Sequence, residues 1–443
     1  MGTGLDTIYR EQGSKRTIAL CMAAGAVEGF DIQAAGVAAP KLGPMLHLTP
    51  HQLGLFFASA NVGMMAGAVL GGLIADRYGR RFALALSLAV FGVFTYATVC
   101  VQNFEILCLT RFLTGLGMGG ALASLVAIAA EAVDPRRRGS AVGVVYAATP
   151  LGGALASAAS MVVESWQSLF LLGAILPLLL IPLVIGLLPS SEASRAPCRV
   201  NNEVKSGGGI LDRENRVATG LLWIAFFLLA LVLFLLMNWQ PILLVSKGFT
   251  GKSASAVQIA FSVSAAVASI VAGLVSDTPH RRLAVVVSVC LLLCALYYFA
   301  VMPPDLPLAV LAGVALGAGV ASGQSILYGL APQAYQEHVR GTGVGFAVGM
   351  ARLGSIVGPL LAGILIANGR TVTEVLIGIM PIVAAGGLAT FLLVTVLERR
   401  RRKSSMTETE AAHQAADGLA GPCVVAKARS AAMPSEIHDV RSA

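Results

Sequence analysis

The sequence predicts an all-α membrane protein with twelve transmembrane helices in two six-helix halves. Three observations predict it: the 443-residue chain is 56% hydrophobic and only 12% charged, its apolar residues form long blocks, and its second half repeats features of the first. Soluble domains carry about 25% charged residues, so a soluble chain of this composition would lack polar groups for its surface. A block of about 20 apolar residues crosses a bilayer as a helix, because backbone groups in lipid must be hydrogen-bonded within the segment.

The apolar blocks place the spans in two sets. The first block carries Glu28 and Asp31 and is too long for a signal peptide, so it is counted as the first span. The predicted spans of the first half are 17–39, 52–74, 82–102, 106–130, 139–163 and 168–188, and those of the second half are 217–240, 256–276, 283–302, 306–330, 341–367 and 373–397.

Basic residues gather in alternate loops, and this predicts the topology. Arginines follow the second, fourth, sixth, eighth, tenth and twelfth spans, whereas the opposite loops offer only Lys41, Lys247, Lys252 and Arg370. By the positive-inside rule, both termini face the cytoplasm. The predicted domains are an N-terminal tail (1–16), a first half (17–188), a cytoplasmic linker (189–216), a second half (217–397) and a disordered cytoplasmic tail (398–443). Topology explains the net charge of +8, so no nucleic-acid partner is expected.

The two halves match at a nearly constant offset. Gly72-Leu73-Ile74-Ala75-Asp76 recurs 201 residues later as Gly273-Leu274-Val275-Ser276-Asp277, and Arg138-Gly139 recurs 202 residues later as Arg340-Gly341. Parallel halves with the substrate held near the midplane between them are a known plan of secondary transporters. The repeat therefore favours transport over anchoring or signalling.

Longer motifs carry a family resemblance. The run from Gly71 to Arg81 (GGLIADRYGRR) resembles the signature between the second and third helices of the major facilitator superfamily, and Arg111-x3-Gly115-x-Gly117-x-Gly119-Gly120 resembles its fourth-helix motif. The run Glu28-Gly29-Phe30-Asp31 resembles the first-helix signature of the aromatic acid:proton symporters, in which Asp is usual at the first position. The run to Gly36 is closest to the 3-(3-hydroxyphenyl)propionate transporters. The resemblance implies the major facilitator fold, a bacterial inner-membrane location, alternating access, a monomer in lipid, and no cofactor.

Ionisable groups within spans are costly and are functional candidates. Glu28 and Asp31 are three residues apart and share a helix face. We expect Asp31 to be the leading proton carrier with Glu28 as its partner, and Arg111 and Arg352 to be anchors for a substrate carboxylate, with the choice between the arginines open. Protonation of one acid leaves one positive charge for an anion, which couples the proton to the substrate. The alternative is that all four form permanent ion pairs that hold helices together.

Uncharged polar and aromatic residues complete the predicted substrate site. Tyr146, Trp239, Gln324 and Tyr328 fall within or at the edge of spans, where aromatic rings can stack on a substrate ring. Each also has a plain structural reading, since Trp and Tyr are common at membrane interfaces.

Four residues at the cytoplasmic ends of spans match positions that form a gating network in the superfamily: Asp76, Arg80, Glu131 and Arg138. We expect Arg80 to pair with Glu131 in one conformation and to lose that pair in the other. The second copy, Asp277-x3-Arg281, is degenerate because Pro279 and His280 intervene, so its gating role is doubtful.

The predicted function is import of an aromatic carboxylate, best a hydroxylated phenylpropionate, by proton symport. The alternative transporter is a proton-coupled antiporter that exports drugs or metabolites. The Glu28/Asp31 pair together with Arg111 favours an organic anion over a lipophilic cation. An enzyme is not expected, because the sequence offers no nucleophile–base pair, and its seven cysteines form no metal-ligand pattern. No metal site is predicted.

Overall fold

The computed structural model describes residues 3–134, 138–188, 210–212, 215–276, 278 and 280–419. It divides into two compact units, Met1–Leu393 and Val394–Ala443. The described part of the chain forms twelve α-helices and a short 3₁₀ helix, η3: α1 Thr3–Met45, α2 Pro50–Tyr78, α3 Arg80–Cys100, α4 Phe104–Glu131, α5 Arg138–Val162, α6 Trp166–Leu187, α7 Arg216–Ser246, α8 Gly251–Ser276, α9 Arg281–Val301, α10 Leu306–Leu330, η3 Ala331–Ala334, α11 Glu337–Ala367 and α12 Val372–Leu419.

All twelve α-helices are long and apolar enough to cross a membrane, which confirms the predicted number of spans. Each predicted span overlaps one helix, with ends shifted by a few residues for most of them. Capping residues explain several of the observed starts. Thr49 and Gln52 form a capping box at α2, and the side chains of Asn103 and Asp305 accept hydrogen bonds from the first backbone N–H groups of α4 and α10.

The terminal segments differ from the prediction. Helix α1 begins at Thr3 rather than after residue 16, and α12 continues to Leu419 although the tail was expected to lose regular structure at residue 398. The stretch 398–419 is rich in Glu, Arg, Lys and Ala, which are strong helix formers, so the helix continues beyond the apolar residues. Residues 420–443, 189–209 and 213–214 of the predicted tail and linker lie outside the described residues.

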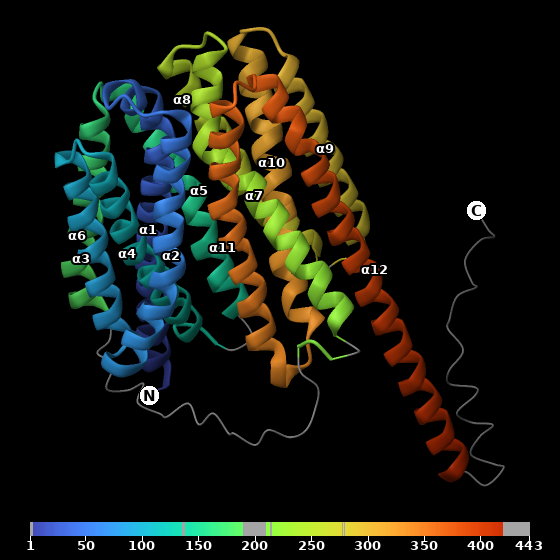
Figure 1. The fold of residues 1–443 in the computed structure, drawn as a ribbon. Helices are drawn as coiled ribbons and strands as arrows, with labels where there is room; N and C mark the ends of the chain where they lie inside the picture. The colour runs from blue at the N-terminus through green and yellow to red at the C-terminus, as the bar shows by residue number, and fades with distance from the viewer. Residues whose placement is uncertain are drawn as a thin grey trace, which may run out of the picture. The chain divides into compact units, whose positions relative to one another are not determined.

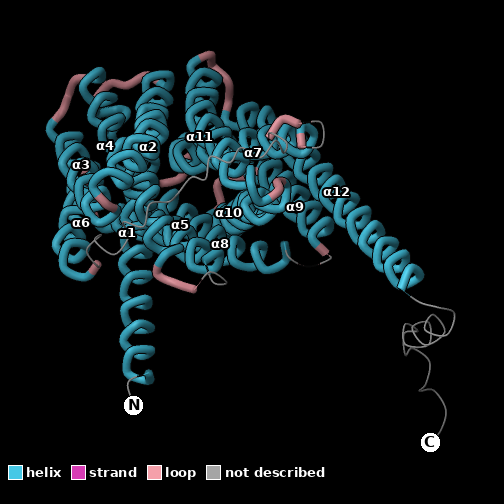
Figure 2. Tube along the Cα trace, turned by 90° about the horizontal axis from the view of Figure 1, so that it is seen from below, coloured by secondary structure: helices cyan, strands magenta, loops and turns pink. Residues whose placement is uncertain are grey.

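Within Met1–Leu393 the helices form a bundle of two halves (Figures 1 and 2). In the first half α2 packs on α4, α1 on α5, and α3 on α4 and α6; in the second half α8 packs on α10, α7 on α11, and α9 on α10. The halves meet where α2 contacts α11, α5 contacts α8, and α1 contacts α7. A site shared by the two halves can therefore form where these helices face one another, namely α1, α2 and α5 of the first half and α7, α8 and α11 of the second.

The halves approach most closely at one end of the bundle. We call the end where α1 finishes the Met45 end, and the opposite end, where α2 finishes, the Tyr78 end. A Cβ atom at Gly54 of α2 would lie 3.0 Å from the carbonyl oxygen of Pro359 in α11, and one at Gly36 of α1 would lie 2.6 Å from the carbonyl oxygen of Met237 in α7. Only glycine allows the helix backbones to come this close.

The same two helix faces separate toward the Tyr78 end. Gly72 lies eighteen residues after Gly54 in α2, and Gly345 lies eighteen residues before Gly363 in α11, which is five helical turns or about 27 Å in each helix. Gly54 and Gly363 contact each other, whereas a Cβ atom at Gly72 or Gly345 would meet nothing within 4 Å. The structure is therefore closed between α2 and α11 at the Met45 end and parted at the Tyr78 end.

Candidate functional site

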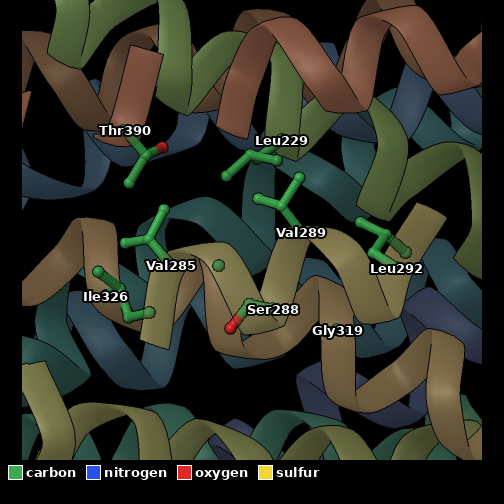
Figure 3. Close-up of a pocket in the computed structure, with 9 residues that line it drawn as sticks. Leu229, Val285, Ser288, Val289, Leu292, Gly319, Ile326 and Thr390 are labelled. Atoms are coloured by element: carbon green, nitrogen blue, oxygen red, sulfur yellow. The ribbon is translucent and has the colours of Figure 1, made fainter. Parts of the chain in front are cut away.

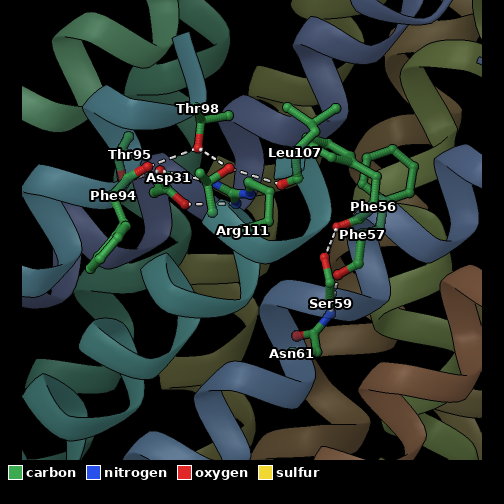
Figure 4. Close-up of polar contacts among 11 residues, drawn as sticks. Asp31, Phe56, Phe57, Ser59, Asn61, Phe94, Thr95, Thr98, Leu107 and Arg111 are labelled. Carbon is green, nitrogen blue, oxygen red and sulfur yellow. Dashed lines mark hydrogen bonds and ion pairs between the residues drawn. The ribbon is translucent and has the colours of Figure 1, made fainter. Parts of the chain in front are cut away.

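Asp31 of α1 and Arg111 of α4 form a buried ion pair (Figure 4). Arg111 Nη2 donates to Asp31 Oδ2 at 2.8 Å and Nη1 donates to Oδ1 at 3.3 Å, and the Thr95 hydroxyl of α3 donates to Oδ1 at 3.3 Å. The relative exposure of Asp31 is 0% and that of Arg111 is 1%. Asp31 was predicted to carry the proton and Arg111 to anchor the substrate carboxylate. In this conformation the two residues neutralise each other.

Aromatic rings enclose the guanidinium of Arg111. Its Cζ atom lies 5.6 Å from the ring centroid of Phe56 and 5.3 Å from that of Phe170, which are cation–π distances. Its Nε atom is buried without a hydrogen-bond partner among the described residues. The planar group is held on one edge by the carboxylate and on its faces by the rings, which fixes its orientation.

Glu28 lies one turn before Asp31 in α1 and has a different environment. Its side chain is buried, and its Oε2 atom has no hydrogen-bond partner among the described residues. Close packing holds this part of α1 against α5, because a Cβ atom at Gly29 would collide with the backbone of Thr149, and one at Gly152 with the backbone of Ala26. Glu28 is therefore held rigidly at the interface between helices but lacks a direct partner.

Arg352 of α11 comes from the second half and lies close enough to Glu28 for the two charges to interact. Its Nη1 atom lies 4.0 Å from the Met64 sulfur of α2, a weak acceptor, and the described residues give its guanidinium no carboxylate partner. Glu28 and Arg352 are thus close enough for their charges to interact but form no direct ion pair, unlike Asp31 and Arg111.

Two predicted tyrosines lie beside this second pair. The rings of Tyr146 in α5 and Tyr328 in α10 stack with centroids 5.7 Å apart, which joins the two halves, and Phe226 of α7 packs edge-on to Tyr328 at 5.1 Å. Both phenol groups lie close enough to Glu28 and Arg352 for their charges to interact. Gln324, one turn before Tyr328, is buried, and its Oε1 atom has no partner among the described residues.

Trp239, a predicted site residue, lies at the Met45 end together with two glutamines that the site prediction missed. The Trp239 indole N–H donates to the carbonyl of Pro359 in α11 at 3.0 Å, and its ring packs edge-on to Phe57. Gln33 of α1 donates to the carbonyl of Met237 at 3.1 Å and accepts a hydrogen bond from Gln258 of α8 at 3.0 Å. A hydrogen bond of 2.7 Å between Ser160 of α5 and Ser255 of α8 also crosses the halves. The rarity of amide side chains in apolar spans is the signal that could have identified Gln33 and Gln258.

The predicted gating residues are only partly described. Arg80 Nη1 lies 2.8 Å from Glu131 Oε1, and the two side chains are 36% and 45% exposed. Asp76 is exposed, while the side chain of Arg138 lies outside the described residues. The expected Arg80–Glu131 contact is present, and it joins the start of α3 to the end of α4 within the first half.

Two small cavities lie inside the bundle. One lies among α7, α9, α10 and α12, and its lining, which includes Leu229, Val285, Leu292 and Thr390, carries no charged side chain (Figure 3). The other lies between the halves, and its lining includes Asn61 of α2, Arg111 of α4 and Asn238 of α7. The first cavity offers two hydroxyl groups, those of Ser288 and Thr390, whereas the second combines an arginine with two amides, which suits an anionic or hydroxylated ligand better. No cluster of three potential metal ligands occurs among the described residues.

Comparison with known protein families gives one match. The model of the Major Facilitator Superfamily matches residues 21–310 and 222–432, which together cover most of the chain.

Characterised relatives and solved structures agree with that match. The chain is 36% identical over 389 residues to the 3-(3-hydroxy-phenyl)propionate transporter of Escherichia coli, which covers 86% of this chain and 94% of that protein. It is 27% identical to the gallate transporter of Pseudomonas putida, over 80% of this chain and 85% of that one. The crystal structure of a D-xylose-proton symporter superimposes with a TM-score of 0.69 at 17% identity, over 85% of this chain and 96% of that one, and so shares its fold.

Proposed function

The chain belongs to the Major Facilitator Superfamily and is a multi-pass transporter of the inner membrane, and from this premise we propose that it imports an aromatic carboxylate together with protons. The preferred substrate is 3-(3-hydroxyphenyl)propionate or a related hydroxylated aromatic acid, because relatives covering most of the chain transport such acids. One observation carries the mechanism: Arg352 has no carboxylate partner among the described residues, and a buried, unpartnered Glu28 lies within reach of its charge.

Charge balance supports a role for Arg352 as the substrate anchor. Asp31 and Arg111 already neutralise each other through two hydrogen bonds. When Glu28 is ionised, it balances the charge of Arg352, and when Glu28 is protonated, that positive charge is left for a carboxylate. An arginine side chain can hold a carboxylate through two parallel hydrogen bonds. The proton and the anion therefore favour each other's binding, which is the thermodynamic basis of symport.

This proposal changes the order of roles expected from the sequence. Asp31 was the leading candidate for the proton, but its carboxylate already accepts three hydrogen bonds from Arg111 and Thr95. Glu28 Oε2 accepts none from the described residues. We therefore assign the transported proton to Glu28 and a positioning role to the Asp31–Arg111 pair.

The stacked tyrosines suit the aromatic part of the substrate. Tyr146 comes from the first half and Tyr328 from the second, and their rings can separate to contact the substrate ring as it passes or close on each other after release. Gln324, with an unpartnered Oε1 one turn away, would complete this side of the site. Trp239 instead supports closure of the Met45 end, because its indole N–H is already bonded to Pro359.

The arginines gathered in alternate loops support a cytoplasmic position for the Tyr78 end under the positive-inside rule. The conformation described here is then open toward the cytoplasm and closed toward the outside, and import proceeds by rocking of the two halves about the site. We further propose that the transporter acts as a monomer.

The proposal is tested by measuring uptake of labelled 3-(3-hydroxyphenyl)propionate into cells. Uptake is compared under an inward proton gradient without and with a protonophore. We expect saturable uptake that collapses with the protonophore. Glu28→Gln, which mimics the protonated acid, should abolish accumulation but retain exchange of labelled for unlabelled substrate. Glu105→Gln, an exposed acid at the start of α4, is the matched control and should behave as wild type. Protonophore-insensitive uptake, or full accumulation by Glu28→Gln, would refute proton transfer through Glu28.

A further inference from the structure

The cavity between the halves contains two asparagines whose amide oxygens are free to accept. Asn61 comes from α2 in the first half and Asn238 from α7 in the second, and both side chains are buried. The Asn61 Nδ2 atom donates to the carbonyl of Phe57 at 3.1 Å, and the Asn238 Nδ2 atom donates to the carbonyl of Phe234 at 2.7 Å. Each bond reaches back four residues along its own helix, which fixes the amide so that Oδ1 is the remaining acceptor. Figure 4 shows the bond from Asn61 to Phe57.

Neither Oδ1 atom accepts a hydrogen bond from any described residue. Polar groups within an apolar span are costly unless a partner satisfies them, so amide oxygens that face a cavity there are sites for a hydrogen-bond donor. Arg111 is the charged donor in the lining, and its two terminal nitrogens are already bonded to Asp31. The lining residues other than Arg111 and the two asparagines are apolar, among them Phe57, Met64 and Met118. An aromatic ring with a hydroxyl group meets both needs, because its face packs on the apolar lining and its O–H donates to an amide oxygen.

The cavity adjoins the proposed carboxylate anchor. Met64, which lines the cavity, is also the residue whose sulfur lies 4.0 Å from Arg352 Nη1. Asn61 lies three residues, or about 4.5 Å along the helix axis, from Met64. A substrate whose carboxylate pairs with Arg352 therefore has its ring directed past Met64 toward the two amides.

We infer that Asn61 and Asn238 together form the site that recognises the ring hydroxyl of the substrate, and that they select hydroxylated over unsubstituted aromatic acids. This inference rests on the proposed function. A phenol donates a single hydrogen bond, and either Oδ1 can accept it, so one asparagine partly replaces the other. Because the acceptors come from different halves, a bound hydroxylated ring also links the halves at this point.

Uptake kinetics with two probes test the inference: 3-(3-hydroxyphenyl)propionate and 3-phenylpropionate, which lacks the hydroxyl. We expect kcat/KM of the wild type to favour the hydroxylated acid by about tenfold or more, because unpartnered buried acceptors disfavour the other acid. Asn61→Leu and Asn238→Leu should each lower this ratio, and the double variant should bring it close to one while transport of 3-phenylpropionate is retained. Ser59→Ala is the matched control on α2, since its hydroxyl bonds to Phe56 within the helix and does not line the cavity.

The outcomes separate the two proposals. No uptake of either acid by the wild type would refute the proposed function, and the inference with it. Uptake of both acids with an unchanged ratio in the double variant would refute only the inference. Equal loss of both acids in the variants would assign the asparagines a structural role and would likewise overturn it.

Discussion

Arg111 Nη2 lies 2.8 Å from Asp31 Oδ2, and this contact joins α4 to α1 in a region from which solvent is excluded. Removing one partner of a buried pair leaves an unpaired charge and typically costs about 3–5 kcal/mol, whereas replacing both partners with neutral groups is often tolerated. We therefore expect Asp31→Asn to lower the free energy of unfolding by about 3 kcal/mol, and Asp31→Asn with Arg111→Met to regain most of it. Unfolding of the purified protein in detergent measures both.

The contrary result is equally informative. If Asp31→Asn is as stable as the wild type, the pair does not hold the helices together in the resting protein. A changed KM for the substrate in that variant would then favour exchange of Arg111 between Asp31 and the substrate carboxylate.

Arg352 gives a separate prediction because its role depends on geometry as well as charge. Arg352→Lys keeps the positive charge but loses the planar pair of donors, so KM should rise about tenfold or more with little change in expression. Arg352→Gln removes the charge and should abolish uptake. Initial rates over a range of substrate concentrations measure the effect, with Arg370→Gln as the control, since that arginine is exposed and its ion pair within the described part of the chain is with the nearby Glu374. Unaltered KM in Arg352→Lys would remove Arg352 from the substrate site.

The number and order of the helices were predictable because the bilayer sets the length of each apolar block. Pairing among the charged residues was not. Glu28 and Asp31 share a helix face in the sequence, yet only Asp31 meets Arg111, and Arg352 reaches the site from the other half. Sequence spacing predicts which residues lie on one face of a helix, but the partner helix and its rotation follow from packing contacts such as those at Gly29 and Gly152.

The polar contacts that close the Met45 end could not be predicted from the sequence for the same reason. Gln33 and Gln258 are 225 residues apart, and nothing in their local sequence relates them. The end of α12 shows the converse error, since low hydrophobicity after residue 397 suggested loss of structure, while the helix propensity of the same residues continues the helix to Leu419.

Ser160 and Ser255 provide a direct test of the closed end. Their hydroxyl oxygens lie 2.7 Å apart between α5 and α8. In Ser160→Cys with Ser255→Cys we expect a disulfide to form under mild oxidation and to abolish uptake, because the Met45 end can no longer open. Reduction should restore transport, and neither single variant should respond. A cross-linked protein that still transports would show that the helices need not part here.

The ion pair between Arg80 and Glu131 is expected to matter for transport more than for stability. Because both side chains are about 40% exposed, the pair should contribute no more than about 1 kcal/mol to folding. If it is made in one conformation and broken in the other, Glu131→Gln should slow uptake severalfold while thermal stability is nearly unchanged. The charge reversal, Arg80→Glu with Glu131→Arg, should recover part of the rate. A large loss of stability in Glu131→Gln would instead assign the pair to folding.

Substitution of two glycines of α2 by leucine should disfavour opposite conformations of the transporter. Gly54 touches α11, with a Cβ position 3.0 Å from the carbonyl oxygen of Pro359, so Gly54→Leu opposes the conformation closed at the Met45 end. Gly72 lies on the same helix face but meets nothing within 4 Å, so Gly72→Leu is accepted in this conformation and opposes only the one in which the Tyr78 end closes. Both variants should therefore lose uptake.

The rate of disulfide formation in the Ser160→Cys, Ser255→Cys background distinguishes Gly54→Leu from Gly72→Leu. Gly54→Leu should slow this cross-link severalfold because the Met45 end spends less time closed, whereas Gly72→Leu should leave it unchanged or accelerate it. If the two substitutions changed the cross-linking rate in the same direction, the two ends of the α2–α11 interface would not close alternately, and rocking of the halves would have to take place about different helices.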